Sequence, residues 1–160
     1  MIKEYQLNLD IKTIQDYVWD VVFDTTLGAK KSNVGGWQST VYWGWNKKLK
    51  ELQMSVEKLI PEYTFQSLWV NSNGYGDYND MHIHEPKRVD GISGVYYVDV
   101  PDKNMGAIYF EDGTQYEPKN NRLLLFPSYL KHGVRKNESK FERVSIAFNY
   151  QKITSSGITI

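Results

Sequence analysis

The chain of 160 residues has the length of about one domain, and its 41% of hydrophobic residues can form a substantial core. Nineteen Lys and Arg residues balance nineteen Asp and Glu residues, which argues against a dedicated nucleic-acid binder. The absence of cysteine excludes disulfides, thiolate metal clusters and cysteine nucleophiles. No apolar run is long enough to span a membrane, and residues 1–10 lack the apolar core of a signal peptide. We therefore expect one cytoplasmic domain over residues 1–160, with no membrane or nucleic-acid partner.

Two helices are predicted in the first part of the chain, over about residues 10–60. Behind Asp10, a favourable N-cap residue, apolar side chains recur at helical spacing, and Gly28 can end this helix. A second apolar stripe at helical spacing ends before Pro61. Residues 32–39, between the two helices, are predicted to form a polar, glycine-rich loop.

Short runs of β-branched and aromatic residues alternate with turn residues in the rest of the chain. The predicted strands cover about residues 63–71, 80–84, 92–100, 107–111, 122–127 and 143–151. Many short strands at this spacing are typical of a sandwich, a jelly roll or a barrel. We predict a mainly β protein with N-terminal helices (an α+β fold), in which a jelly-roll-like core over about residues 62–151 packs against two helices. Residues 152–160 are expected to form a loose tail.

The chain contains only three histidines, which are His82, His84 and His132. Since alternate residues of a strand face the same side, the first two imidazoles can converge on one metal ion. The third follows the apolar strand 122–127 and can complete a facial metal site from a distant strand. The alternative for the H-x-H pair is two polar residues on a surface strand. A further alternative is that Asp80 or a water replaces His84 as the third ligand.

The predicted strand 143–151 alternates between two kinds of side chain. Arg143, Ser145 and Asn149 share one face, and the apolar residues on the other face are expected to pack against the helices. An arginine with a neighbouring hydroxyl can hold a carboxylate through charge-assisted, bidentate hydrogen bonds. The alternative for this polar face is a strand surface exposed to water.

Taken in order, these segments resemble the 2-oxoglutarate- and Fe(II)-dependent oxygenase superfamily, and most closely a small family of bacterial and phage oxygenases. The shared motifs are GGWQS at 35–39, H-x-H at 82–84, SGVYY at 93–97, FPS-x-x-x-H at 126–132 and R-x-S-I-A-F-N at 143–149. Each motif is a weak signal by itself, whereas five in this order are specific. The sequence departs from the superfamily at His84, where an Asp or a Glu is usual.

The resemblance implies a double-stranded β-helix, a jelly-roll or cupin-like core, with helices on one face. It implies Fe(II), 2-oxoglutarate and O2, and a reaction that couples oxidative decarboxylation of 2-oxoglutarate to succinate with hydroxylation of a substrate. The implied metal ligands are His82, His84 and His132. The implied residues for 2-oxoglutarate are Arg143, Ser145, Tyr97 and Asn71, with Arg143 and Ser145 on the distal carboxylate.

Four aromatic and polar residues are candidates for contacting the substrate. Trp37 and Gln38 belong to the GGWQS motif, and the alternative for Trp37 is a place in the core. Tyr75 and Tyr78 belong to segment 72–80, which we expect to be a mobile loop that closes over the substrate. A plain turn is the alternative for this segment.

The identity of the substrate does not follow from the sequence. A peptide or protein side chain and a small molecule are both compatible with it, and a homodimer is left open. Two other functions also remain. One is a three-histidine iron enzyme of the cupin type that does not use 2-oxoglutarate, and the other is a non-catalytic jelly-roll binding module.

Overall fold

The computed structural model describes residues 1–24, 28–29, 33–83 and 90–153. The helices are α1 (Ile11–Phe23), the 3₁₀ helix η2 (Lys47–Leu49) and α2 (Lys50–Leu59). The strands are β1 (Lys3–Gln6), β2 (Gly28–Ala29), β3 (Asn33–Val34), β4 (Trp37–Ser39), β5 (Tyr63–Asn73), β6 (Tyr78–His82), β7 (Gly91–Asp99), β8 (Ile108–Phe110), β9 (Gln115–Tyr116), β10 (Arg122–Pro127), β11 (His132–Val134) and β12 (Arg143–Lys152).

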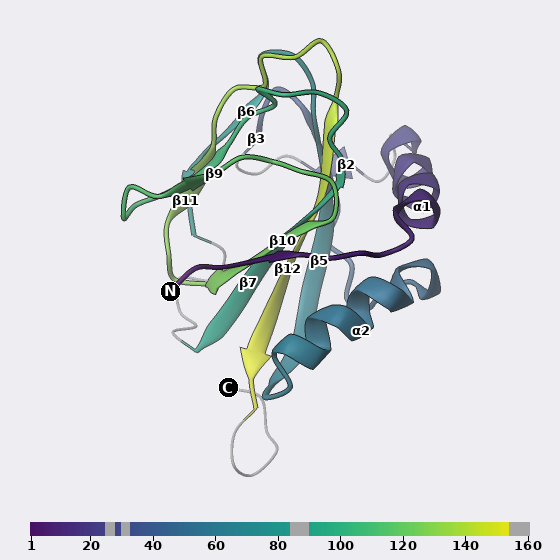
Figure 1. The fold of residues 1–160 in the computed structure, drawn as a ribbon, viewed down its shortest axis with the longest axis vertical. Helices are drawn as coiled ribbons and strands as arrows, with labels where there is room; N and C mark the ends of the chain where they lie inside the picture. The colour runs from purple at the N-terminus through teal and green to yellow at the C-terminus, as the bar shows by residue number, and fades with distance from the viewer. Residues whose placement is uncertain (25–27, 30–32, 84–89, 154–160) are drawn as a thin grey trace.

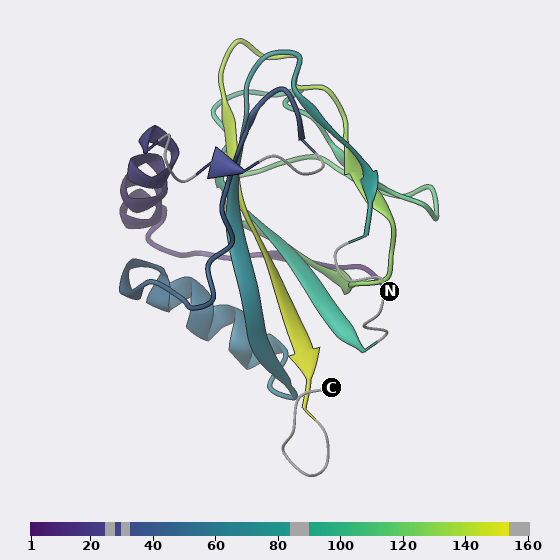
Figure 2. The same cartoon turned by 180° about the vertical axis from the view of Figure 1, so that it is seen from behind.

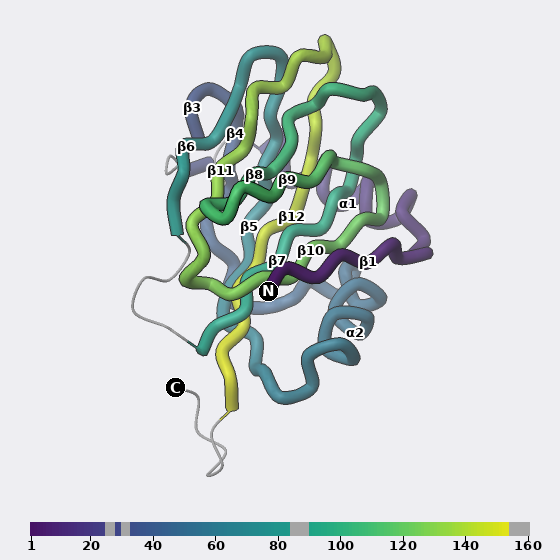
Figure 3. The backbone as a smooth tube through the Cα atoms, turned by 60° about the vertical axis from the view of Figure 1, so that its left-hand side comes forward, coloured from purple at the N-terminus to yellow at the C-terminus, as the bar shows by residue number. Residues whose placement is uncertain are grey.

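These strands form two antiparallel sheets that face one another. The large sheet has the order β1-β10-β7-β12-β5-β4-β2, and the small sheet has the order β3-β6-β11-β8-β9. Figures 1 and 2 show both helices on the outer side of the large sheet, away from the small sheet. Figure 3 shows the small-sheet strands lying beside one another in front of the large sheet. The predicted jelly-roll-like core with two helices outside it is therefore confirmed.

The main core lies between the helices and the outer face of the large sheet. Helix α1 contributes Ile14 and Val18, and α2 contributes Leu52 and Val56, all at helical spacing. On the sheet side, every second residue of β12 belongs to this core: Val144, Ile146, Phe148 and Tyr150. The predicted packing of this apolar face against the helices is confirmed. Burying each such side chain contributes about 1.5–3 kcal/mol relative to leaving it in water.

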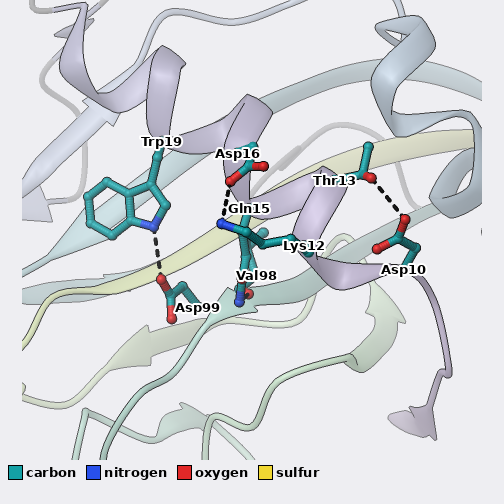
Figure 4. A network of polar contacts seen from close by, with 8 residues as sticks. All are labelled: Asp10, Lys12, Thr13, Gln15, Asp16, Trp19, Val98 and Asp99. Atoms are coloured by element: carbon teal, nitrogen blue, oxygen red, sulfur yellow. Dashed lines mark hydrogen bonds and ion pairs between the residues drawn. The ribbon is translucent and has the colours of Figure 1, made fainter.

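Two side-chain hydrogen bonds attach α1 to the end of β7 (Figure 4). Gln15 Nε2 donates to the carbonyl oxygen of Val98 at 3.0 Å, and Trp19 Nε1 donates to Asp99 Oδ2 at 2.8 Å. Both donors lie on the face of α1 that meets the sheet, so they remain hydrogen-bonded although they leave water.

The first helix is shorter than its sequence pattern suggests. The helix begins after Asp10, whose carboxylate accepts a hydrogen bond from the Thr13 hydroxyl at 2.9 Å. It ends at Phe23. The prediction that Gly28 ends it is wrong, because Gly28 pairs with Ser39 as part of β2. The predicted loop 32–39 also contains strands, since β3 and β4 join the edges of the two sheets. Strands of two or three residues are too short to show a period, which explains why pattern analysis missed them.

The longer strands agree with their predicted ranges to within about two residues. The end of α2 before Pro61 is confirmed, although the helical segment begins at η2. Strand β1, at the edge of the large sheet beside β10, was not predicted. The expected tail lies mostly in residues 154–160, outside the described residues.

None of the helices in the described ranges is both long enough and apolar enough to span a lipid bilayer.

Candidate metal and cosubstrate site

A narrow cavity of about 40 Å³ lies between the inner faces of the two sheets. The large sheet contributes Trp69, Asn71, Val95, Tyr97, Arg143, Ser145 and Ala147, and the small sheet contributes Asn79, His82, Ile108, His132 and Val134. Six of the residues implied by the resemblance thus meet in one place. They come from β5, β6, β7, β11 and β12, which are distant in sequence, so only the pairing of the sheets brings them together.

His82 and His132 meet across the small sheet. They are register partners in the β6–β11 pair, and their ring centroids are 4.5 Å apart. Phe126 of β10 packs against the His132 ring, with 4.8 Å between the ring centroids. Two adjacent imidazoles with an apolar wall on one side can serve as two neighbouring ligands of one metal ion.

Both imidazoles are held in the form that binds a metal. His82 Nδ1 lies 2.8 Å from the Asp80 carbonyl oxygen, and His132 Nδ1 lies 3.1 Å from the Leu130 carbonyl oxygen. Because a carbonyl only accepts, Nδ1 carries the proton in each ring and Nε2 keeps its lone pair. Burial, together with the neighbouring His82, lowers the pKa of His132 to about 4, and burial also lowers the pKa of His82. Both rings are therefore neutral near pH 7.

A β-bulge in β6 decides which neighbours share the face of His82. His82 pairs with His132, but Asn79 pairs with Val134, so two residues of β6, Asp80 and Met81, oppose the single residue Gly133 of β11. Asn79 and His82 consequently both line the cavity, while the side chain of Asp80 is exposed. The alternative in which Asp80 replaces His84 as the third ligand is not supported, because the Asp80 side chain is exposed and does not line the cavity.

The third predicted ligand, His84, lies outside the described residues. Within residues 1–24, 28–29, 33–83 and 90–153, no three or more His, Cys, Asp or Glu side chains are grouped as metal ligands. The described part of the site therefore contains two of the three residues predicted to be ligands, His82 and His132.

Arg143 brings a buried positive charge to the cavity. It is 2% exposed, and its Nη1 donates to the Gly106 carbonyl oxygen at 3.3 Å. In the described part of the chain, its Nε has no hydrogen-bond partner and no carboxylate pairs with it. Burial lowers the pKa of this guanidinium, as is expected for a charge without a counter-ion. Such a group is costly unless a ligand supplies the missing anion.

The other residues implied for 2-oxoglutarate lie in one row beside Arg143. Ser145 of β12 is the register partner of Asn71 on one side and of Tyr97 on the other, and all three line the cavity. The Tyr97 ring centre lies 6.0 Å from the Arg143 guanidinium carbon. A hydroxyl, an amide and a phenol thus stand next to the unpaired guanidinium, as a carboxylate site requires.

The two candidates in the GGWQS motif point to opposite faces of β4. Trp37 packs against the core on the helix side, so its candidate role in contacting substrate is not supported and its core interpretation is correct. Gln38 is the register partner of Asn71 and is 3% exposed, and its Oε1 has no partner among the described residues. Alternation along a strand explains why neighbouring residues have different surroundings.

Segment 72–80, predicted to be a mobile loop, contains the end of β5, the start of β6 and the turn between them, through which the chain passes from the large sheet to the small sheet. The backbone N–H of Gly76 donates to the Asn137 carbonyl oxygen at 2.7 Å, and Gly74 N–H donates to Asp77 Oδ2 at 2.8 Å. Tyr75 is exposed at the tip, whereas Tyr78 is half-buried in β6 with the Lys136 ammonium 5.7 Å from its ring centre. Neither tyrosine lines the cavity that contains the histidines.

Sequence reasoning missed several residues of the cavity wall. Among these, Trp69 has the largest side chain and Asn79 is polar. Asn79 Oδ1 accepts a hydrogen bond from Asn73 Nδ2 at 3.0 Å. Alternation along β5 relates Trp69 to Asn71 and was available as a signal. No sequence signal indicated Asn79, because the bulge sets its direction.

Comparison with known proteins agrees with this geometry. A family model described as "Putative 2OG-Fe(II) oxygenase" matches residues 109–149, which contain His132, Arg143 and Ser145. The viral collagen prolyl hydroxylase of Paramecium bursaria Chlorella virus-1, solved with 2-oxoglutarate, has the same fold. Its TM-score is 0.71 at 15% identity, over 93% of this chain and 95% of that chain. The family model covers about a quarter of the chain, whereas the likeness in fold to 2-oxoglutarate- and Fe(II)-dependent oxygenases extends over most of it.

Other solved structures share the fold of this chain. A prolyl hydroxylase of Trichoplax adhaerens, solved with a hypoxia-inducible factor peptide, has a TM-score of 0.71 at 19% identity, over 94% of this chain and 82% of that chain. HygX of Streptomyces hygroscopicus, solved with nickel, 2-oxoglutarate and hygromycin B, has a TM-score of 0.67 at 10% identity, over 93% and 82%. Their ligands differ, so the shared fold does not identify a substrate.

One curated protein has a local similarity to this chain. It is described as a LysW-L-2-aminoadipate/LysW-L-glutamate phosphate reductase of Haloquadratum walsbyi and is 38% identical over 58 residues. The match covers 35% of this chain and 17% of that protein, so the chain spans less than a fifth of its length. A match of this extent does not transfer an activity.

Proposed function

We propose that the protein is a 2-oxoglutarate- and Fe(II)-dependent oxygenase, which couples oxidative decarboxylation of 2-oxoglutarate to succinate with hydroxylation of a substrate C–H bond. The observation that carries this proposal is the buried guanidinium of Arg143, which lines the same cavity as the two neutral imidazoles. A cavity with metal ligands and an unpaired cation suits a ligand that chelates a metal and carries a distal carboxylate. 2-Oxoglutarate has both features.

His82, His132 and His84 are the proposed ligands of Fe(II). The backbone carbonyls on the two Nδ1 atoms orient the first two rings and leave Nε2 to the metal. Bound Fe(II), 2-oxoglutarate and O2 would supply the oxidising chemistry of hydroxylation. Three neutral ligands would give the site one negative charge less than two histidines and a carboxylate, so binding of an anionic cosubstrate would be favoured electrostatically.

Arg143 is proposed to bind the distal carboxylate, with the Ser145 hydroxyl as a second donor. Tyr97 and Asn71 stand in the same row and would supply further hydrogen bonds. Because Arg143 already lies on a strand and is already buried, little side-chain entropy would be lost when the carboxylate binds. These residues bind and orient the cosubstrate and take no part in proton transfer.

The apolar residues of the cavity are proposed to exclude water from the metal. Val95, Ile108 and Ala147 line the cavity from both sheets. A dry cavity strengthens the attraction between Arg143 and a carboxylate, because fewer water dipoles screen it.

Anaerobic titration tests the proposal directly. The full chain is titrated with Fe(II) and then with 2-oxoglutarate, and we expect a weak visible charge-transfer band to appear only after the second addition. Release of succinate in air should require both Fe(II) and 2-oxoglutarate. Iron binding without the band would favour a cupin-type enzyme that does not use 2-oxoglutarate, and no iron binding would favour a binding module.

A further inference from the structure

A second polar region lies further along the inner face of the large sheet. Asn149 of β12 is the register partner of Ser67 on β5 and of Ser93 on β7, and each is at most 6% exposed. Ala147 of β12 lines the cavity, with Arg143 before it in the strand and Asn149 after it. The row of Asn149 therefore adjoins the end of the cavity that is opposite Arg143. No residue of this row belongs to the predicted metal or cosubstrate site.

The row is close to the histidines. Phe126 is the register partner of Ser93 on the other side, and its ring packs against His132 with 4.8 Å between the ring centroids. The preceding row, with Trp69, Val95 and Ala147, lines the cavity itself. A group bound over the polar row would therefore lie next to the metal ligands.

The hydrogen bonds within the row have one direction. Ser93 Oγ donates to Asn149 Oδ1 at 2.7 Å, since a carbonyl only accepts. The Ser128 hydroxyl, 2.8 Å from Ser93 Oγ, must then donate to it. Asn149 Nδ2 in turn contacts Ser67 Oγ at 3.5 Å, which leaves the Ser67 hydroxyl proton available to a further acceptor.

Gln151 adds an acceptor to the same face. It is 2% exposed, and within the described residues its Oε1 has no hydrogen-bond partner. Its register partner is Gly91, where a Cβ would lie 2.8 Å from Ser128 Oγ. The glycine thus makes room for the serine over the sheet. A buried acceptor without a donor is costly, and a ligand that supplies the donor removes this cost.

We propose that this polar row, defined as Ser67, Ser93, Ser128, Asn149 and Gln151, recognises the substrate through an uncharged group that both donates and accepts hydrogen bonds. Such a group is an amide or a hydroxyl. All five side chains are neutral, so a carboxylate or an ammonium would lose its hydration there without gaining a counter-charge. The inference rests on the proposed function, because it assigns the row to the substrate of that same site.

Binding of small probes to the full chain tests this assignment without any turnover. Acetamide and ethanol represent the amide and the hydroxyl, and acetate and methylammonium are charged probes of similar size. The NMR signals of the Asn149 and Gln151 side-chain amides should shift saturably with acetamide, with ethanol or with both. The two neutral arms identify which group the row prefers. We expect the charged probes to bind at least about tenfold more weakly.

Variants separate the row from its surroundings. Gln151→Leu should weaken binding of the preferred neutral probe about fivefold to tenfold, as for one hydrogen bond. Ser67→Ala is a second variant that keeps the test valid if the first does not fold. Gln66→Leu, next to Ser67 but outside the row, is the matched control and should bind the probe like the unmodified chain.

Three results would overturn the assignment. They are no saturable shift with either neutral probe, equal binding of a charged probe, or full retention of probe binding in both row variants. A chain that forms the charge-transfer band with 2-oxoglutarate but fails these tests keeps the proposed function and loses this inference. A chain that passes these tests but does not form the charge-transfer band keeps this inference about the polar row and loses the proposed function.

Discussion

The imidazoles of His82 and His132 face one another across the β6–β11 pair, with ring centroids 4.5 Å apart. Each Nδ1 is held by a backbone carbonyl two residues earlier in the chain, at Asp80 and at Leu130. The same local bond on both strands sets the same tautomer in both rings. The backbone therefore orients the two imidazoles that we propose as metal ligands.

Replacing Arg143 should separate binding from stability. We expect Arg143→Met to weaken 2-oxoglutarate binding by about 2–5 kcal/mol, because a desolvated charge pair is lost. The same change should leave the free energy of unfolding unchanged or raise it, since it removes a buried charge that has one hydrogen bond. Calorimetry of the iron-loaded protein and urea unfolding of the free protein measure the two effects.

The exposed Arg135 is the matched control for this prediction. Arg135→Met should bind 2-oxoglutarate normally. Normal binding by Arg143→Met would contradict the assignment. Ser145→Ala should have an intermediate effect of about 1 kcal/mol, as for one hydrogen bond.

Metal binding should depend on the three histidines and not on Asp80. Fe(II) in excess should raise the melting temperature, and EDTA should reverse the rise, because the metal binds only the folded chain. His82→Ala and His132→Ala should abolish the rise, while His84→Asp should keep part of it by restoring a common ligand. Asp80→Asn is the control and should behave like the unmodified protein, since the bulge turns this side chain outward. Loss of iron in Asp80→Asn would show that the carboxylate is a ligand.

A hydrogen-bonded tyrosine links β12 to α2. The Tyr150 hydroxyl donates to Glu57 Oε2 at 2.8 Å and accepts from Trp45 Nε1 at 2.9 Å. Tyr150→Phe removes both bonds and should cost about 1–3 kcal/mol of unfolding free energy, measured in urea. Tyr75→Phe, at an exposed position, is the control and should change it by less than about 0.5 kcal/mol.

The same tyrosine should make stability depend on alkaline pH. Burial, followed by the hydrogen bond to Glu57, raises the pKa of Tyr150 above its usual value. A raised folded-state pKa gives stability that is fully present below about pH 10, the unfolded value, and is lost progressively above it. Tyr150→Phe should flatten the fall of stability above pH 10. An unchanged slope would mean that other groups cause it.

Gly94 permits the close approach of β7 and β12. A Cβ at this position would lie 2.2 Å from the Phe148 ring, so Gly94→Ala should destabilise the protein by about 3 kcal/mol or more. Gly44→Ala is the control, because a Cβ there meets no atom within 4 Å. Adding Phe148→Leu to Gly94→Ala should recover part of the loss, whereas two independent effects would simply add.

The turn between β5 and β6, which connects the two sheets, should be protected from hydrogen exchange. The Gly76 amide donates to the Asn137 carbonyl oxygen, and Asn137 N–H donates to the Asp77 carbonyl oxygen at 3.0 Å. We expect slower exchange at Gly76 than at Tyr75, measured by NMR on the ligand-free chain. Equal and rapid exchange at both positions would restore the mobile-loop interpretation.

Local patterns in the sequence were sufficient for several features. The alternation of residues 143–151 assigned Val144 and its neighbours to the helix side and Arg143 to the inner face, because side-chain direction in a regular strand depends only on parity. The scarcity of histidine, together with the order of five motifs, indicated the oxygenase family. Such features are encoded within a few residues of one another, so no knowledge of the sheet pairing was needed.

Other features were decided only by the tertiary structure. The bulge that turns Asp80 outward and Asn79 inward depends on the pairing of β6 with β11, which is not local. The assignment of Trp37 to the core and of Gln38 to the inner face depends on which side of β4 meets the helices. That Arg143 Nε and Gln151 Oε1 have no hydrogen-bond partner among the described residues becomes visible only when the neighbouring strands are in place. The period of the sequence determines which side chains share a face of a strand. The strand register and the stacking of the two sheets determine which residues each of those side chains contacts.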